Sequence, residues 1–185
     1  EYFKEKITDT RAPKIQGILI CPQQGKGVVN GSSRKLELKP VTAKNGKQTI
    51  TGKIEAWGEI GLAVKAYDYM DNTTNIYGVK DITLRQDSQI IYHSNLDRFA
   101  FDETRYLNSY VDYEEWKDRR SFYMRSFVEP GNRLRFNESV NRGIIHIGEE
   151  KTYHLTYTLS DAFGNTTRLS VWIEGKEQEI PEIET

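Results

Sequence analysis

The sequence predicts a mostly β protein, an antiparallel β-sandwich that carries a helix-containing insertion. Three observations lead to this fold class. Apolar residues alternate with polar ones over several stretches, turn residues separate those stretches, and one segment changes to helical spacing. Alternation with a period of two buries one face of a strand and leaves the other in water. Repeated short strands of this kind are typical of a sandwich.

The alternation is most regular in three segments of the 185-residue chain. The first has Ile50, Gly52, Ile54 and Ala56 as its inward positions and resumes after Trp57 with Gly58, Ile60, Leu62, Val64 and Ala66. The second has Tyr153, Leu155, Tyr157 and Leu159, and the third has Leu169, Val171 and Ile173. Burial of each large apolar side chain contributes about 1.5–3 kcal/mol. Four such side chains in one strand therefore outweigh a local preference for helix.

Turn residues lie where these strands should end. The Asn-Gly pair at 30–31 tolerates positive φ angles, as tight turns require. The segment 161–165 lies between two well-patterned strands and is expected to close a hairpin. The Asp-Ser pair at 87–88 is expected to join a strand through Leu84 to one through Tyr92.

The rhythm changes between about residues 96 and 141, which we interpret as an insertion. Apolar spacing within it predicts a short helix near 102–117, with Asp102 as its N-cap. A strand over 122–128 is expected to follow the helix. The insertion would therefore add a helical layer to the sandwich.

We expect a single β-sandwich domain over residues 1–175 and an acidic, flexible tail over 176–185. The chain begins with charged residues and without methionine, so we expect it to be a segment of a longer protein.

Composition excludes several classes of function. The chain has 26 basic and 27 acidic residues, interspersed, with a net charge of −1. Nucleic-acid binding needs a concentrated basic face, so we expect no nucleic-acid partner. No apolar run approaches the ~20 residues of a membrane span.

Cys21 is the only cysteine in the sequence, which excludes an intrachain disulfide. The simplest interpretation is that it is a small, buried apolar residue.

Seven short segments together resemble one known family. They are DTRAPKI at 9–15, YDYMD at 67–71, YGV at 77–79, LDRFAFDETRY at 96–106, SFVEPGN at 126–132, NRGII at 141–145 and SDAFGN at 160–165. Their order and combination resemble the non-catalytic β-sandwich region that follows the peptidase domain in lysostaphin-type zinc metalloendopeptidases of Gram-negative bacteria. The similarity covers about residues 9–171.

The resemblance implies that catalysis belongs to a domain preceding this chain. In the family, that peptidase domain binds zinc through a His-x-x-x-Asp pair and a His-x-His pair. Here His93 and Asp97 have the first spacing, but no His-x-His occurs. Zinc catalysis needs three protein ligands and an open position. We therefore expect no catalytic residue and no cofactor in this chain, zinc only in the peptidase domain, and a periplasmic or cell-envelope location.

The Asp-containing loops resemble those of bacterial immunoglobulin-like domains. Asp68, Asp71 and Asp161 are candidate calcium ligands, if these loops meet at one end of the sandwich. Their spacing does not fit an EF-hand loop. The simpler interpretation is that the side chains cap their own turns.

Aromatic and arginine residues gather on the predicted helix and just after it. They are Tyr106, Tyr113, Trp116, Arg119 and Arg120. Interfaces favour Tyr, Trp and Arg, and sugars stack on aromatic faces. The alternative is that the helix packs an apolar stripe on the sandwich, and that its remaining side chains are simply exposed to solvent. If the residues form a surface, docking onto the preceding peptidase domain is the first interpretation.

Three functions from different classes remain open at this point. The first is a non-catalytic accessory domain of a lysostaphin-like peptidase that hydrolyses peptidoglycan. The second is a peptidoglycan- or glycan-binding module. The third is an independent cell-wall hydrolase that uses carboxylates, as glycosidases do.

Overall fold

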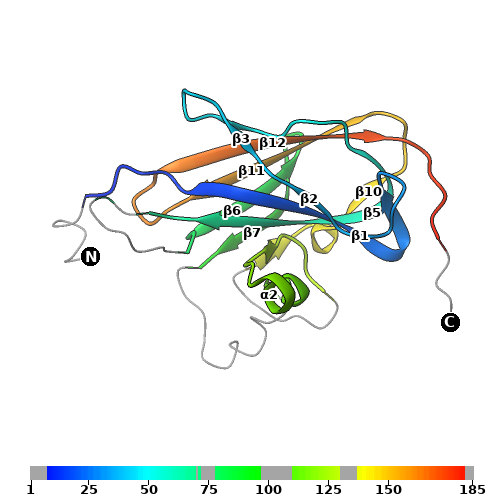
Figure 1. Ribbon diagram of the computed structural model, residues 1–185, viewed down its shortest axis with the longest axis horizontal. Coiled ribbons are helices and arrows are strands. Elements are labelled where there is room, and N and C mark those ends of the chain that lie inside the picture. The colour runs from blue at the N-terminus through cyan, green and yellow to red at the C-terminus, as the bar shows by residue number, and fades with distance from the viewer. Residues whose placement is uncertain (1–7, 70, 72–77, 97–109, 130–136, 182–185) are drawn as a thin grey trace.

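Figure 1 shows the computed structural model of the protein. The residues that it describes are 8–69, 71, 78–96, 110–129 and 137–181.

Hydrogen bonds join ten strands into one sheet. Eight of them follow the order β2 (Leu36–Leu38), β1 (Lys14–Val29), β5 (Glu55–Tyr67), β12 (Thr166–Gly175), β11 (Thr152–Ser160), β6 (Asp81–Gln86), β7 (Gln89–Asn95) and β9 (Asn137–Ser139). Two short strands, β8 (Met124–Arg125) and β10 (Ile145–Ile147), also pair with β5. A separate pair is formed by β3 (Val41–Thr42) and β4 (Gln48–Thr49).

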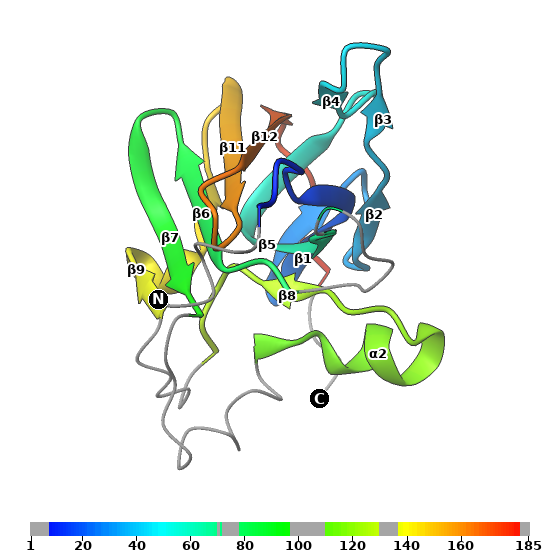
Figure 2. The ribbon, with the colours of Figure 1, turned by 90° about the vertical axis from the view of Figure 1, so that its left-hand side faces the viewer.

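The long sheet curls around its own core (Figure 2). Neighbouring strands are antiparallel except where the end of β12 runs parallel to the start of β5. The core is formed by the alternating residues of β1, β5, β6, β11 and β12. Within it, the Tyr157 hydroxyl donates a hydrogen bond to Ser126 Oγ at 2.8 Å, so the buried hydroxyl has a partner.

The mostly β prediction is confirmed, as are the strands that alternation predicts, except that residues 50–54 lie outside any strand and β5 starts at Glu55. The β11–β12 hairpin turns through 161–165, and the β6–β7 hairpin turns at Asp87, whose φ is 53°. An asparagine or aspartate tolerates this left-handed conformation better than other non-glycine residues. The sandwich and its immunoglobulin-like arrangement stay predictions, because the hydrogen bonds unite the strands into one curled sheet.

The predicted helix near 102–117 is interrupted in the structure at residues 111–112. Val111 forms an isolated bridge with Met124, and Asp112 is extended, with φ −69° and ψ 101°. The helix α2 begins only afterwards, at Tyr113–Arg119, with Asp112 as its N-cap. The expected N-cap, Asp102, and residues up to 109 lie outside the described part of the chain. The expected strand over 122–128 is present as the two residues of β8.

The described part of the predicted tail contacts the sheet. β12 ends at Gly175, as expected, but the Lys176 amide donates to Ala56 O at 3.1 Å. The Gly31 amide donates to Gln178 Oε1 at 2.7 Å. The tail therefore contacts β5 through Lys176 and the turn after β1 through Gln178. Separately, no helix among the described residues has the length and apolarity that crossing a membrane requires.

Two strands approach very closely where β1 bulges between Pro22 and Gly27. Gly27 faces Gly58 across the β1–β5 pair. A Cβ on Gly27 would lie 2.0 Å from the Glu59 carbonyl oxygen. Gly58 has a φ of 80°, which few residues other than glycine adopt. Both positions therefore require glycine, and the bulge lets β1 follow the curl of the sheet.

Candidate functional site

Three aspartates lie close together at one end of the sheet. This is the end where β1 starts, to the left in Figure 1. Asp9 precedes β1, Asp68 follows β5 and Asp161 follows β11. β1 and β5 are antiparallel, so the start of one lies beside the end of the other. One carboxylate oxygen from each aspartate lies within 4.8 Å of one from each of the others. We call this group the aspartate cluster.

The aspartate cluster is buried. The exposed fractions of Asp9, Asp68 and Asp161 are 8%, 5% and 4%. No ion pair among the described residues includes any of the three. Charged carboxylates are rarely buried to this degree without a compensating cation.

The three aspartates of the cluster differ in how many hydrogen bonds their carboxylates accept. Asp161 is well satisfied, because its Oδ1 accepts from the amides of Phe163 and Asn165 at 2.8 and 2.9 Å. The Asn165 side chain donates to Asp161 Oδ2 at 2.7 Å and to the Asp9 carbonyl at 2.9 Å. Asp68 Oδ1 accepts from the Tyr69 amide at 2.9 Å. The turn-capping interpretation is therefore confirmed for Asp161.

Asp9 differs from the other two. Its Oδ1 accepts from the amides of Arg11 and Asp71 at 3.1 and 3.2 Å. Its Oδ2 is buried and has no hydrogen-bond partner among the described residues. A buried acceptor without a partner costs about 1–3 kcal/mol, and more when it is charged. This oxygen is the unusual feature of the site.

Burial raises the pKa of Asp68 above its ordinary value. The negative charges of Asp161 and Asp9 raise it further, while the Tyr69 amide and the positive charge of Arg11 oppose the shift. The Arg11 guanidinium lies over the Tyr69 ring, 5.4 Å from its centre. The three carboxylates therefore repel one another, and Arg11 relieves only part of that repulsion.

The structure brings together two of the three calcium candidates from the sequence. Asp68 and Asp161 belong to the cluster, whereas the Asp71 carboxylate accepts from the amide and hydroxyl of Thr10 at 2.9 and 2.8 Å. Asp9 was missed, because nothing near it in sequence marks a ligand. The signal that could have found it is strand pairing, since β1 must start beside the residue that ends β5.

Helix α2 carries the second group of candidates. None of its residues is buried, and Tyr113 is 55% exposed. The Tyr113 and Trp116 rings are 6.0 Å apart, and the Arg120 guanidinium lies 4.7 Å from the centre of the Trp116 ring. Phe122, also exposed, follows in sequence. These four residues are the α2 surface.

The other candidates from the sequence lie apart from this stack or outside the described residues. Arg119 pairs with Glu37 and Glu115, with N–O distances of 3.7 and 3.6 Å. Tyr106 lies outside the described residues. Tyr110, within the predicted helix, is buried.

A buried ionic network holds α2 in place. The Asp112 side chain is 0% exposed, and Lys35 Nζ lies 2.9 Å from both of its oxygens. Arg125 Nη2 lies 3.4 Å from Oδ2. The Glu115 amide donates to Oδ1 at 3.3 Å, which caps the helix. The helix is therefore held by charged residues at its N-terminus and not by a buried apolar stripe.

The histidines do not form a metal site among the described residues. The single group of three possible ligands there is the aspartate cluster, and no histidine belongs to it. His93 Nε2 lies 2.9 Å from Asp81 Oδ2, and Asp97 lies outside the described residues. His154 stacks on Trp172, with ring centres 3.9 Å apart.

Cys21 is not a reactive thiol. Burial, and to a smaller extent the negative charge of Asp112, raises its pKa to about 12, so the thiol stays neutral.

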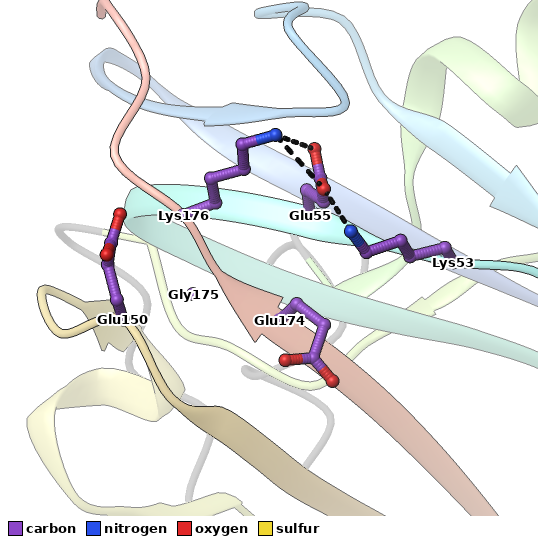
Figure 3. Close-up of a pocket in the computed structure, with 6 residues that line it drawn as sticks. All are labelled: Lys53, Glu55, Glu150, Glu174, Gly175 and Lys176. Atoms are coloured by element: carbon purple, nitrogen blue, oxygen red, sulfur yellow. Dashed lines mark hydrogen bonds and ion pairs between the residues drawn. The ribbon is translucent and has the colours of Figure 1, made fainter.

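A hollow at the other end of the sheet bears on the hydrolase alternative. Figure 3 shows Glu55, Glu150 and Glu174 around it, with Lys53 and Lys176 on either side of Glu55. The Lys53–Glu55 and Lys176–Glu55 distances are 2.6 and 3.3 Å. The hydrogen bond from Lys53, helped by Lys176, holds the pKa of Glu55 below its usual range. An ion-paired carboxylate with a low pKa is poorly suited to act as a general acid.

Comparisons with known protein families, with curated proteins and with solved structures found no match for this chain.

Proposed function

We propose that the chain is a non-catalytic accessory domain of a cell-envelope lysostaphin-like zinc metalloendopeptidase. In this proposal, an immunoglobulin-like β-sandwich supports the α2 surface, and the α2 surface docks onto the preceding peptidase domain, which holds the zinc. One observation carries the docking role: α2 buries none of its own residues, yet the Asp112 network anchors it. The family and the periplasmic or envelope location rest on the resemblance of the sequence segments.

The mode of anchoring supports this proposal. A surface helix ordinarily buries an apolar stripe against the core, and that burial holds it in place. α2 is held instead by Lys35 and Arg125 at its N-terminus, so its aromatic side chains are left for another partner. Trp, Tyr and Arg supply most of the binding energy in protein interfaces. Because Arg120 already stacks on Trp116, less side-chain freedom is lost on binding.

The docking prediction concerns Trp116. In a binding assay between this chain and its parent's peptidase domain, produced separately, Trp116→Ala is expected to weaken the complex about thirty-fold or more, or about 2 kcal/mol. Arg120→Ala should act in the same direction. Isothermal titration calorimetry measures both. The matched control is Trp172→Ala, since Trp172 is an exposed tryptophan on β12, and it should leave the affinity unchanged. Equal effects of both tryptophan variants, or no binding by the wild type, would contradict the proposal.

A second candidate function, glycan binding, is favoured by the surface around Trp172. This exposed indole lies nearly parallel to the His154 ring, at 10°, and His154 Nε2 lies 3.0 Å from Ser170 Oγ. An aromatic face beside hydroxyl groups suits a sugar ring.

The glycan prediction is tested by co-sedimentation with purified peptidoglycan. If the second function holds, the wild-type chain sediments with the polymer and Trp172→Ala stays in the supernatant. Trp116→Ala is then the control that should still sediment. The reverse pattern would place the glycan on the α2 surface, and wild-type protein that never sediments would remove this function.

A further inference from the structure

We propose that Asp9, Asp68 and Asp161 bind one calcium ion, which joins the start of β1, the end of β5 and the β11–β12 turn. This inference is independent of the accessory role. The accessory role depends on the exposed α2 surface, whereas the calcium site is the buried aspartate cluster. It rests on the geometry and burial of the aspartate cluster and on the unpartnered oxygen of Asp9.

The turn alone does not explain the cluster. Asp161 caps the 161–165 turn and needs no ion for that purpose. Asp9 and Asp68 come from two other segments, and neither caps that turn. Two more carboxylates beside Asp161 add a repulsion that the amide hydrogen bonds of Asp9 and Asp68 do not neutralise, because amides carry no net charge. Their convergence therefore calls for a group that attracts all three.

The unpartnered oxygen points to a ligand. Asp9 is more than nine-tenths buried, and its Oδ1 already accepts two amide hydrogen bonds. Its Oδ2 accepts no hydrogen bond from the part of the chain that the structure describes, although carboxylates are among the most strongly hydrated groups in proteins. A bound cation would satisfy this oxygen and neutralise the repulsion among the three carboxylates in the same step.

The chemistry of the ligands selects the ion. All three are carboxylates, and oxygen ligands are preferred by hard cations rather than by zinc, which favours nitrogen and sulfur. Calcium–oxygen distances are about 2.3–2.6 Å, so oxygens on opposite sides of one calcium ion lie up to about 5 Å apart. The cluster falls within this span. Magnesium holds its ligands at about 2.0–2.1 Å in strict octahedral geometry and keeps several waters, so it should bind more weakly here.

Calcium binding is tested on the whole chain by thermal unfolding and calorimetry. After treatment with EDTA and removal of the chelator, CaCl₂ at about a hundred-fold excess over Kd should raise Tm by roughly 5–10 °C. Calorimetry should show one ion per chain. MgCl₂ should give a smaller rise in Tm than CaCl₂ does. An unchanged Tm and no heat of binding with CaCl₂ would overturn the proposal.

Asp9→Asn is the decisive variant. Its amide oxygen can still accept from Arg11 and Asp71, while an NH₂ group replaces the unpartnered Oδ2. Calcium affinity should fall at least ten-fold. In EDTA the variant should unfold at the wild-type Tm or above it, because one of three repelling charges is gone. If the variant keeps the wild-type calcium affinity, the assignment is wrong.

Two further variants protect the result against a failure to fold. Asp68→Asn keeps the acceptor for the Tyr69 amide and should also lose calcium affinity at least ten-fold. Asp87→Asn is the matched control: it makes the same change of charge in the exposed β6–β7 turn, where asparagine suits the left-handed backbone. It should bind calcium as the wild type does. Equal losses in Asp68→Asn and Asp87→Asn would show a nonspecific effect of charge and overturn the proposal.

Discussion

Replacing Asp112 with Ala is expected to destabilise the protein by about 3 kcal/mol, because Lys35 and Arg125 lose their buried partner and keep only the exposed Glu114 and Glu129. The carboxylate is fully buried, and it is the common partner of Lys35 and Arg125. It also caps α2 through the Glu115 amide, and loss of a cap typically costs about 1 kcal/mol. Chemical denaturation of wild type and variant measures the difference in free energy of unfolding.

Glu114→Ala is the matched control for this effect. Glu114 pairs with the same lysine, with Oε2 2.6 Å from Lys35 Nζ, but its side chain is 75% exposed. Exposed ion pairs contribute about 0–1 kcal/mol, so this variant should lose less than 1 kcal/mol. If both variants lose the same small amount, the buried network does not anchor the helix, and the case for a preformed α2 surface weakens.

The Asp112 network also predicts a pH dependence. Burial raises the pKa of Asp112, but the hydrogen bond from Lys35 and the charges of Arg125 and Lys35 outweigh burial, so the folded-state pKa is lower than usual. The unfolded carboxyl titrates near pH 3.9. Stabilisation by Asp112 is therefore complete above that pH and is lost as pH falls through the lower, folded-state pKa. The difference in free energy of unfolding between wild type and Asp112→Ala should be constant near neutral pH and should become smaller in strong acid.

Gly27→Ala is the second substitution with a large expected effect, a loss of about 3 kcal/mol or more. The added Cβ would lie 2.0 Å from the Glu59 carbonyl oxygen and 2.9 Å from its carbon. Carbon atoms in contact prefer about 3.5–4.0 Å, so the two central strands must separate. The atoms in the way are backbone, and no side chain can rotate to make room.

Gly78→Ala is the control for the same change of residue. Nothing lies within 4 Å of a Cβ at Gly78, and its φ is not in the left-handed range. The change should be neutral or stabilise slightly, because alanine lowers the entropy of the unfolded chain. Thermal unfolding of both variants provides the comparison. If the Gly27→Ala protein is as stable as the Gly78→Ala protein, the close approach of β1 and β5 at Gly27 tolerates a side chain.

The α2 region shows where local pattern stops being informative. Helical spacing predicted a helix near 102–117 with Asp102 as its cap. Asp102 lies outside the described residues, and the described helix α2 starts after Asp112, which meets Lys35 and Arg125 from distant parts of the chain. These partners of Asp112 are visible only after the chain has folded.

The aspartate cluster shows the same division at the candidate metal site. The sequence alone marked Asp68 and Asp161, because both stand in turn-rich loops after well-patterned strands. It also marked Asp71, whose carboxylate binds Thr10, and it gave no sign of Asp9. Which loops meet depends on strand order, and β5, β11 and β12 are brought together by pairings that no local pattern encodes.

Alternation, turn residues and charge balance were sufficient to determine that this is a β protein, where its best strands run and which hairpins close. These features depend on neighbours in sequence, since a strand buries every second residue whatever partner it finds. Only the tertiary structure decided that one curled sheet forms, that Asp112 fixes α2, and that three aspartates share a buried site. Each of these depends on contacts between segments far apart in the chain, and electrostatic repulsion or attraction acts there only once folding has brought the charges together.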